Sequence, residues 1–435
     1  MKEAIITKIK NKDFKIAIVG MGYVGLPLAL RFNSVGFEVI GIDIDDSKVA
    51  KLNNCESYIK HISKKDVEGA IKTNKFFAST DFSLVRKCDA IIICVPTPLD
   101  DKLEPDLSYV RHTRDKILQH VKKGQLVSLE STTYPGTTEE EFEAVLKDKG
   151  FNIGQDFFIV YSPEREDPAN QKFSTDTIPK VCGGITKECR DIGAAMYSAA
   201  IDKIVLVESA KVAEMTKLLE NIHRAVNIGL VNEMKIIASK MDIDIFDVID
   251  AAATKPFGFT PYYPGPGLGG HCIPIDPFYL SWKSKQIGID AEFIELSGKV
   301  NRKMPLYVVN NIIDIMKKMN MSMEKSKILL LGMAYKKNVD DMRESPSLEI
   351  LKQLERQGLS VDYSDPFINK FENLRKYQHQ KESISVTVNN LKKYDITVLL
   401  TDHDQFNYDL IFKHSNIIID TRGKFRKDNK RIFSS

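Results

Sequence analysis

The sequence contains no apolar run near the roughly 18 residues that a membrane-spanning helix needs. Its longer apolar runs, such as residues 90–95, have the length of a single strand. Residues 1–15 scatter charged side chains among apolar ones, so they lack the unbroken apolar core of a secretory signal peptide. These absences disfavour a membrane protein and a secreted protein, and we expect a cytoplasmic location.

Cysteine motifs and net charge are also sparse. The six cysteines form no CxxC pair and no metal-ligand spacing with histidine, so no metal site is expected. Thiols in this pattern are typical of a reducing cytosol. The net charge of +3 over 435 residues gives no indication of a nucleic-acid partner. We expect two or three domains, because a domain usually holds about 100–200 residues.

Strand-like and helix-length segments alternate at both ends of the chain. A β-branched run at residues 14–20 and an apolar run at 327–332 each end in glycine, as a buried parallel strand does before a turn and a helix. Further strand-like runs lie at 37–43, 90–95, 125–130 and 157–161, and then at 359–363, 396–400 and 416–420. This alternation predicts two Rossmann-like, doubly wound parallel sheets, in domains 1–208 and 321–435.

The segment between these domains, 209–320, has a mainly helical pattern and is expected to be a central helical domain with one long helix. Its apolar residues recur at steps of three or four, which marks one helix face. That stripe is longer than one domain would bury, so the helix is a candidate surface for a homodimer. The stripe consists of Val212, Met215, Leu219, Ile222, Val226 and Leu230.

A dinucleotide-binding motif follows the first strand. The sequence GMGYVG at 20–25 has glycines for a tight turn, for close approach of a pyrophosphate and for helix–strand packing. The second strand ends at Asp43, 23 residues after the first glycine, where a carboxylate suits the adenosine ribose and favours NAD over NADP. The alternative is a glycine-rich turn in an unrelated α/β protein. The expected cofactor contacts in the loop are Gly20, Gly22, Tyr23, Val24 and Gly25.

Two other strand ends carry polar residues. Pro96 and Thr97 follow the run at 90–95, and Thr132 follows the run at 125–130. The carboxyl ends of parallel strands line the ligand crevice of an open α/β sheet, so these three are candidate cofactor contacts. Hydroxyls that cap turns are an equally good interpretation of the threonines.

The segment 257–277 is crowded with glycine and proline, which predicts a shaped loop. Its glycines let backbone N–H groups approach a ligand, and Cys272 follows them with Asp276 four residues later. A thiolate can attack an aldehyde, and the thiohemiacetal can give hydride to NAD and become a thioester that water cleaves. The alternative is an inert core thiol. His271 is interpreted as structural.

Three polar clusters complete the candidate site. Lys217 and Asn221 are four residues apart, with Arg224 nearby, so on a helix they can together hold a water or an alkoxide. A solvated polar face is the alternative. The sequence SPERED at 162–167 is either an exposed turn or the source of an active-site carboxylate. The segment 335–345 follows the first C-terminal strand, and Ser345-Pro346 predicts a helix start.

These motifs together resemble the UDP-glucose/GDP-mannose dehydrogenase family from about residue 15 to 422. The matching pieces occur in family order: GMGYVGLPLA, CVPTP, ESTTYPGTT, SPERED, KLLEN, GPGLGGHCIPIDP, GMAYKKNVDDMRESPS and DTRG. Within the family the chain looks most like the UDP-N-acetylhexosamine 6-dehydrogenases, and the SPEREDP form looks like the UDP-N-acetylglucosamine branch. One departure is Ala169-Asn170, where Gly-Asn is expected, and it bears on the acetamido side of the sugar.

The resemblance implies NAD-dependent oxidation of C6 in two successive steps, giving a uronic acid and two NADH. It implies Cys272 as nucleophile, Lys217 as oxyanion stabiliser and Asn221 as a residue that helps to hold water. It also implies that Asp276 assists proton transfer and that Glu164 orients the water for thioester hydrolysis. Such uronic acids commonly serve capsule or O-antigen polysaccharide synthesis.

The resemblance also implies binding residues. Arg343 is expected near the nicotinamide pyrophosphate, and Arg224 is expected to reach across a dimer. The residues expected to bind the UDP-sugar are Glu164, Arg165, Lys217, Asn221, Arg224, Tyr262, Gly265, Leu268, Gly269, Tyr335, Lys336 and Arg422.

Several alternatives remain at this point. The same chemistry can act on UDP-N-acetylgalactosamine, UDP-N-acetylmannosamine, UDP-glucose or GDP-mannose. A two-electron NAD dehydrogenase of the hydroxyacid or 6-phosphogluconate type would not need Cys272 and would release one NADH per substrate. A regulator that only binds NAD would need neither the cysteine nor the Lys217 cluster.

Overall fold

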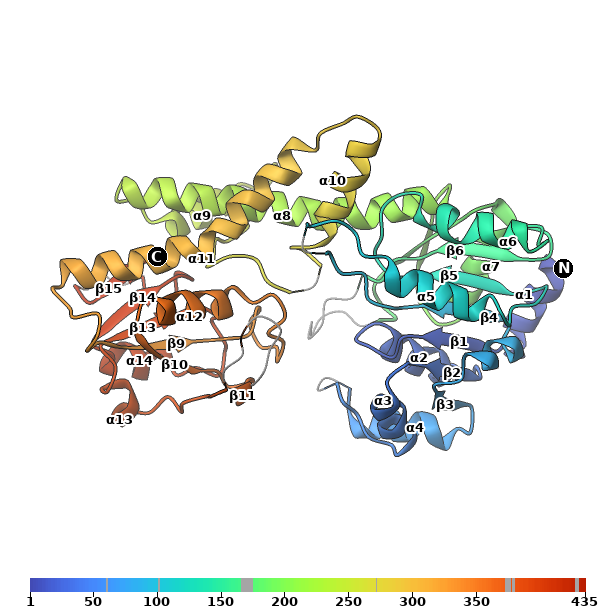
Figure 1. Ribbon diagram of the computed structural model, residues 1–435, viewed down its shortest axis with the longest axis horizontal. Helices are drawn as coiled ribbons and strands as arrows, with labels where there is room; N and C mark the ends of the chain where they lie inside the picture. The colour runs from blue at the N-terminus through green and yellow to red at the C-terminus, as the bar shows by residue number, and fades with distance from the viewer. Residues whose placement is uncertain are drawn as a thin grey trace. The chain divides into compact units, whose positions relative to one another are not determined.

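The computed structural model describes residues 1–59, 62–100, 102–165, 175–270, 272–371, 377, 380–426 and 430–435 (Figure 1). The chain divides into two compact units, Met1–Glu220 with Phe278–Asp290, and Asn221–Pro277 with Ala291–Ser435. The interpretations of His271 and of Ala169-Asn170 fall outside the described residues. The division into three domains at 208 and 320 stays a prediction.

The first unit contains an eight-stranded sheet with the order β3-β2-β1-β4-β5-β6-β7-β8. Neighbouring strands are parallel except β6 and β7. The central strands are buried at every residue, which explains their continuous apolar runs. The strands are β1 (Ile16–Val19), β2 (Val39–Ile42), β3 (Phe76–Ser79), β4 (Ala90–Ile93), β5 (Leu126–Leu129), β6 (Phe158–Tyr161), β7 (Lys180–Gly184) and β8 (Ile204–Leu206).

Helices cover this sheet and bury their apolar faces on it. Ile16 and Ile18 of β1 share one core with Phe32 of α2 and with Ile192 and Met196 of α7. The helices of this unit are α1 (Lys2–Lys10), α2 (Gly25–Ser34), α3 (Asp46–Asn53), α4 (Lys64–Lys72), α5 (Ser108–Ile117), α6 (Ala144–Asp148) and α7 (Lys187–Ser198), with a 3-10 helix η1 (Phe82–Lys87) and a π-helix η2 (Glu139–Glu143).

The second unit contains a five-stranded parallel sheet with the order β10-β9-β13-β14-β15. Ile328 and Leu330 of β9 pack in one core with residues of α11 and α12, whereas Leu329 and Leu331 pack in another with residues of α13 and α14. Successive side chains of a strand point to opposite faces, so the sheet is covered by helices on both sides. This confirms the predicted doubly wound fold class.

The elements of the second unit are β9 (Lys327–Leu331), β10 (Ser360–Ser364), β11 (Lys370–Phe371), β12 (Lys381–Glu382), β13 (Ile396–Leu399), β14 (Ile417–Asp420), β15 (Ile432–Ser434), α9 (Ile245–Ala253), α11 (Glu292–Lys318), α12 (Pro346–Arg356), α13 (Val388–Leu391) and α14 (Tyr408–His414). Ser345 caps α12 by accepting from the Ser347 N–H, as the Ser-Pro sequence predicts. In the described residues no helix combines the length and the apolar character needed to cross a membrane.

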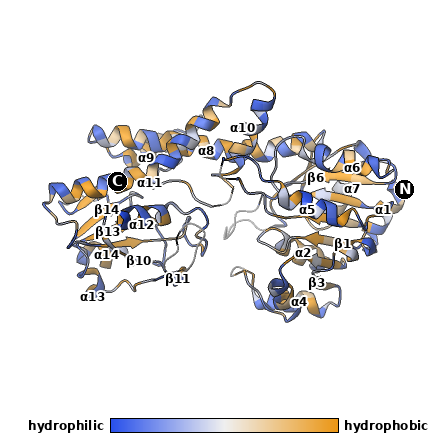
Figure 2. Ribbon diagram, in the orientation of Figure 1, coloured by the Kyte–Doolittle hydropathy of each residue, from blue (hydrophilic) through white to orange (hydrophobic). Residues whose placement is uncertain are grey.

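Two helices contribute to both units, namely α8 (Ala210–Lys240, 31 residues) and α10 (Asp276–Gln286). Hydrophobic and hydrophilic residues alternate along α8 (Figure 2). The apolar stripe expected on this helix is largely not buried by the rest of the chain. Val212, Met215, Leu219 and Leu230 are exposed by 42%, 45%, 65% and 55%. The side chains that α8 buries include the polar residues Glu214, Lys217, Asn221, Asn232 and Lys235.

Candidate active site

The dinucleotide loop joins β1 to α2, and two of its glycines are required by the backbone itself. Gly20 has φ +96°, and a Cβ there would lie 2.7 Å from the Cys94 carbonyl oxygen. A Cβ at Gly25 would lie 1.9 Å from the Gly20 carbonyl oxygen. At Gly22 a Cβ would meet nothing within 4 Å. The loop therefore leaves open space at the position where a pyrophosphate is expected to approach, and its residues fit a dinucleotide.

Asp43 follows β2 and is only 6% exposed. Its carboxylate accepts from the Met21 N–H at 2.8 Å and from the Asp45 N–H at 3.0 Å, so it holds the loop in shape. The Tyr58 hydroxyl donates to the Met21 carbonyl oxygen, and burial, aided by Asp43 and Asp45, raises the pKa of Tyr58 well above its usual value. Sequence reasoning missed Tyr58, and the ribose contact of Asp43 stays a prediction.

The other candidate cofactor contacts lie at the carboxyl ends of β4 and β5. Thr97 is buried, Thr132 is half-buried and Pro96 is exposed. Ser131 donates to the Val95 carbonyl oxygen at 2.7 Å, which ties the two strand ends together. The first unit thus brings these residues to one edge of the sheet, beside the loop at 20–25, because β1 pairs with β4 and β4 with β5. Their contacts with NAD stay predictions.

A buried charged network lies at the same edge of this sheet. Glu130 follows β5 and has no exposed side-chain surface, and Lys180 at the start of β7 is 5% exposed. The Lys180 Nζ lies 2.8 Å from Glu130 Oε2, and the Tyr197 hydroxyl donates to Glu130 Oε1 at 2.6 Å. Burial raises the pKa of Glu130, and Lys180 opposes that shift. Burial lowers the pKa of Lys180, but the charges of Glu130 and Glu164 reverse this and leave it raised.

Glu164 and Arg165, from the SPERED sequence, join this network. The Glu164 carboxylate accepts from the Arg165 N–H at 2.7 Å and lies 3.4 Å from Lys180 Nζ. The Lys217 ammonium, on α8, donates a hydrogen bond to the Glu164 carbonyl oxygen at 2.5 Å. Arg165 pairs with Glu220 of α8 at 2.6 Å. The first unit therefore brings together Glu164, Arg165 and Lys217, whereas sequence reasoning missed Lys180 because a single lysine at a strand start carries no motif.

Cys272 lies in the second unit and is exposed, unlike the buried Cys88, Cys182 and Cys189. Burial raises the pKa of Cys88 and of Cys182 to about 12, so both stay protonated and inert. The backbone carbonyl of Cys272 accepts from the Asp276 N–H at 2.8 Å, in the turn that leads into α10. An inert core thiol is therefore the wrong interpretation of Cys272, which is accessible to a ligand.

Asp276, Asn221 and Arg224 form a chain of hydrogen bonds in the second unit. The Asn221 amide donates to the Asp276 carboxylate, and Arg224 donates to the Asn221 amide oxygen. Asn221 and Asp276 are 0% and 2% exposed, and Lys217 on the same helix is 7% exposed. A solvated polar face is therefore also the wrong interpretation of this cluster.

The glycines of the 257–277 loop allow close packing against other predicted substrate residues. A Cβ at Gly269 would lie 2.6 Å from the Cβ of Tyr335, and one at Gly265 would lie 2.6 Å from a guanidinium nitrogen of Arg422. Gly270 donates its N–H to the Arg343 carbonyl oxygen at 2.9 Å. These contacts gather Gly265, Gly269, Tyr335, Arg343 and Arg422 around one loop.

The contacts of four other predicted binding residues do not indicate a particular ligand. The Arg343 guanidinium pairs with Asp341 at 2.6 Å, so its expected place near a pyrophosphate stays a prediction. The Tyr262 ring meets the His223 ring of α8 edge-on at 5.8 Å. Leu268 and Lys336 are half-buried. Their roles in binding also stay predictions.

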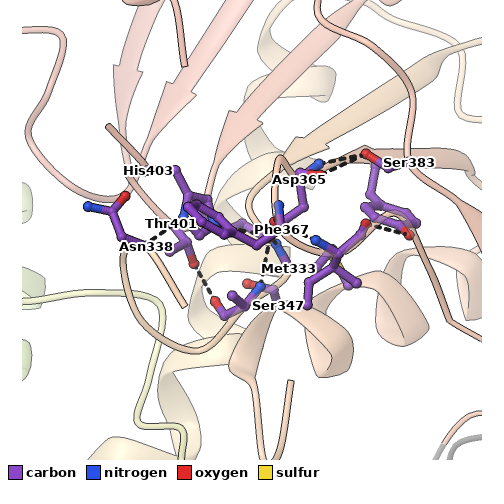
Figure 3. A network of polar contacts seen from close by, with 12 residues as sticks. Met333, Asn338, Ser347, Asp365, Phe367, Ser383, Thr401 and His403 are labelled. Carbon is purple, nitrogen blue, oxygen red and sulfur yellow. Dashed lines mark hydrogen bonds and ion pairs between the residues drawn. The ribbon is translucent and has the colours of Figure 1, made fainter. Parts of the chain in front are cut away.

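A polar network that sequence reasoning missed shapes the loop carrying Tyr335 and Lys336 (Figure 3). Asp365, after β10, accepts from the Met333 N–H at 2.6 Å, as Asp43 accepts from the Met21 N–H in the first unit. His403 Nε2 lies 3.1 Å from Asp365 Oδ2, and its Nδ1 accepts from the Asn338 N–H at 2.9 Å. The two sheets thus use an acid at the end of the second strand in the same way.

Comparison with known proteins matches the chain to three domains of one family. Residues 14–201 match the NAD binding domain of the UDP-glucose/GDP-mannose dehydrogenase family, 211–303 its central domain and 329–427 its UDP binding domain. The chain belongs to the UDP-glucose/GDP-mannose dehydrogenase family. This confirms the resemblance stated from the motifs, and the NAD binding domain confirms NAD as the cofactor.

Relatives within this family act on different sugars. The chain is 35% identical over 397 residues to a UDP-N-acetyl-D-glucosamine 6-dehydrogenase of Pseudomonas aeruginosa, covering 91% of this chain and 92% of the relative. It is 34% identical to a UDP-N-acetyl-D-mannosamine dehydrogenase of Methanococcus vannielii, covering 91% and 88%. A solved UDP-D-ManNAc dehydrogenase structure from Pyrococcus horikoshii superposes with a TM-score of 0.86 at 29% identity, covering 97% and 98%.

Proposed function

We propose that this chain oxidises the C6 hydroxyl of UDP-N-acetylglucosamine to the carboxylate in two NAD-dependent steps. The observation that carries the proposal is the exposed Cys272, in the turn that leads into the buried Asp276, whose carboxylate accepts from the buried Asn221 amide. An accessible thiol among fixed polar groups suits covalent capture of an aldehyde. The 35% identity to a UDP-N-acetylglucosamine 6-dehydrogenase supports the sugar.

The first oxidation removes a proton from the C6 hydroxyl and a hydride from C6. Bound NAD supplies the chemistry of hydride acceptance. Asp276 assists the transfer of the hydroxyl proton, and the Lys217 ammonium stabilises the negative charge that develops on the oxygen. The low exposure of Lys217 and Asp276 strengthens such interactions, because they act away from bulk water.

The second oxidation starts from the aldehyde. The sulfur of Cys272 bonds to C6 and the carbonyl oxygen takes a proton, which gives a thiohemiacetal. Loss of that proton and of a second hydride gives a thioester. Water directed by Glu164 then attacks the thioester carbon, the C–S bond breaks, and the uronic acid is released. Asn221 helps to hold the water. Capture by Cys272 keeps the reactive aldehyde bound throughout.

UDP-N-acetylmannosamine is the second candidate substrate. The 34% identity to the UDP-N-acetylmannosamine dehydrogenase and the TM-score of 0.86 with its Pyrococcus counterpart favour it. The two sugars differ in the orientation of one acetamido group, so the surroundings of that group decide between them. A role in capsule or O-antigen synthesis and a cytoplasmic location stay predictions.

The protein is further proposed to be a homodimer or a higher homo-oligomer, with α8 in the interface. Leu219 and Leu230 are exposed by 65% and 55%, and Met234 and Ile237 continue the same helix face with 41% and 47% exposure. An apolar stripe of this length on a surface helix is typical of a protein–protein interface. The proposed reach of Arg224 across the dimer depends on this arrangement.

The substrate and the number of oxidations are tested in one experiment. Purified protein is supplied with excess NAD and limiting amounts of four UDP-sugars: N-acetylglucosamine, N-acetylmannosamine, N-acetylgalactosamine and glucose. Absorbance at the NADH band and chromatography of the product give NADH formed per sugar consumed. Two NADH per UDP-N-acetylglucosamine supports the proposal. One NADH per sugar, or no reaction with any of the four, overturns it.

A further inference from the structure

The side chain of Lys180 is 5% exposed and pairs with two carboxylates of the first unit, those of Glu130 and Glu164. Its ammonium is 2.8 Å from Glu130 and 3.4 Å from Glu164. A lysine at this depth is rare unless its charge is compensated, and here two acids compensate it. The proposed reaction gives Lys180 no part.

On the side away from Glu164, Lys180 pairs with a buried, hydrogen-bonded carboxylate. Glu130 is fully buried, and its second carboxylate oxygen accepts from the Tyr197 hydroxyl at 2.6 Å. The Tyr197 hydroxyl lies 2.7 Å from the Ser128 hydroxyl on β5. The position of the Lys180 ammonium is therefore set by contacts with β5 and α7, independently of its pairing with Glu164.

Glu164 is the more exposed end of the same network. Its carboxylate side chain is 14% exposed, its Oε1 accepts from the Arg165 N–H at 2.7 Å, and its Oε2 faces Lys180. Its carbonyl oxygen accepts from Lys217. Lys180 thus supplies a positively charged partner to the Glu164 carboxylate.

We infer that Lys180 is a positioning residue for thioester hydrolysis, whose ammonium, anchored by Glu130, orients the Glu164 carboxylate and keeps it ionised as a base. This inference rests on the function proposed above. In the step concerned, Glu164 accepts a proton from water while the water oxygen bonds to the thioester carbon. The C–S bond then breaks, the Cys272 sulfur takes up a proton, and the carboxylic acid leaves. No electrons are exchanged with NAD in this step.

Loss of Lys180 is expected to affect the hydrolysis step and not the two oxidations. If Lys180 acts through Glu164, its loss slows the release of the acid but leaves both hydride transfers able to occur. The first turnover then yields two NADH per active site and stops at the thioester on Cys272. A merely structural role would instead weaken both oxidations together, without accumulation of that intermediate.

Substitution of Lys180 alone leaves two buried carboxylates uncompensated, so Lys180→Met can fail to fold. The test therefore uses Lys180→Met with Glu130→Gln, which removes both members of the anchoring pair. Lys180→Arg is the conservative variant, and Lys123→Met is the control because it deletes an ion pair with Asp156 on the same unit, with Lys123 63% exposed. Thermal melting verifies that each variant is folded.

Each variant is mixed with NAD and UDP-N-acetylglucosamine, or with whichever UDP-sugar the wild type oxidises. Stopped-flow absorbance measures the NADH formed, and mass spectrometry of the intact protein detects an adduct. The double variant is expected to give a burst of two NADH per site, a steady rate lower by about a hundredfold, and an acyl adduct. Lys180→Arg is expected to recover most of the rate. Adding Glu164→Gln to the double variant is expected to lower the rate little further.

Several results would overturn the inference: an unchanged steady rate in the folded double variant, loss of the burst together with the steady rate, or an additive effect of Glu164→Gln. Failure of the proposed function is recognised separately in the wild type, which would then form other than two NADH per sugar or show no dependence on Cys272.

Discussion

A methyl group added at Gly22 should weaken NAD binding without destabilising the protein. A Cβ at this position meets no atom within 4 Å, and Gly22 does not have a positive φ. Gly22→Ala should therefore change the free energy of unfolding by no more than about 0.5 kcal/mol, as surface substitutions do. The methyl would occupy the space proposed for the pyrophosphate. Overpacking of about 1–3 kcal/mol corresponds to a rise of about 5- to 150-fold in the Kd for NAD.

The matched variant Gly25→Ala should act in the opposite way. Its Cβ would lie 1.9 Å from the Gly20 carbonyl oxygen, so the loop and the start of α2 have to move apart. The same overpacking of about 1–3 kcal/mol then appears as lost stability. For a domain of this size that corresponds to a fall in Tm of about 2–12 °C.

The two variants are compared by titration with NAD, followed by calorimetry, and by thermal unfolding without NAD. Gly69→Ala is the control, because Gly69 lies within α4 and its Cβ would also meet nothing within 4 Å. It should leave NAD affinity unchanged and raise stability slightly, since alanine favours a helix over glycine. Wild-type NAD affinity in Gly22→Ala, or wild-type stability in Gly25→Ala, would refute the reasoning about this loop.

Three further predictions address catalysis, assembly and pH. Lys217→Ala should lower kcat by about a hundredfold or more, as the loss of an oxyanion donor does, and near-normal turnover would remove its assigned role. The double variant Leu219→Glu, Leu230→Glu should sediment as a monomer in sedimentation velocity. The control Tyr109→Glu, at a side chain that is 44% exposed, should keep the wild-type oligomeric state. An oligomer that persists in the double variant would contradict the proposed interface on α8. Burial raises the pKa of Glu214 from 4.5 to about 7, so its contribution to stability should be full below about pH 4.5 and lost as pH rises through 7. Urea unfolding at pH 5 and pH 8 measures that loss, which is about 3 kcal/mol at most, and Glu214→Gln should make the two values more similar.

The sequence was most informative where one local rule determines the structure. The central strands are buried on both faces, so their apolar runs are continuous and were found. Strands β3, β7, β8 and β15 were missed, as were the two-residue strands β11 and β12. Strand β3 alternates buried and exposed residues, β7 ends in two glycines, and β8 and β15 are short strands at sheet edges with no fully buried residue in β8.

The features that the sequence did not reveal depend on tertiary structure. The stripe on α8 has helical spacing, but spacing does not reveal whether the chain itself or a second copy covers it. Lys180 and Glu130 are 50 residues apart and become a site only through pairing of strands β5, β6 and β7. Asp365 repeats the arrangement of Asp43, yet no GxGxxG sequence precedes it to mark the second loop.

The central claim is that Cys272 carries the sugar as a thioester between oxidation and hydrolysis. The most direct test quenches the wild-type enzyme in acid during turnover with NAD and UDP-N-acetylglucosamine, or with the UDP-sugar that it oxidises, and maps the modified peptide by mass spectrometry. The account predicts an acyl adduct of the UDP-sugar on Cys272, absent when NAD is omitted and absent in Cys272→Ala. Full turnover by Cys272→Ala, or an adduct on another cysteine, would contradict it.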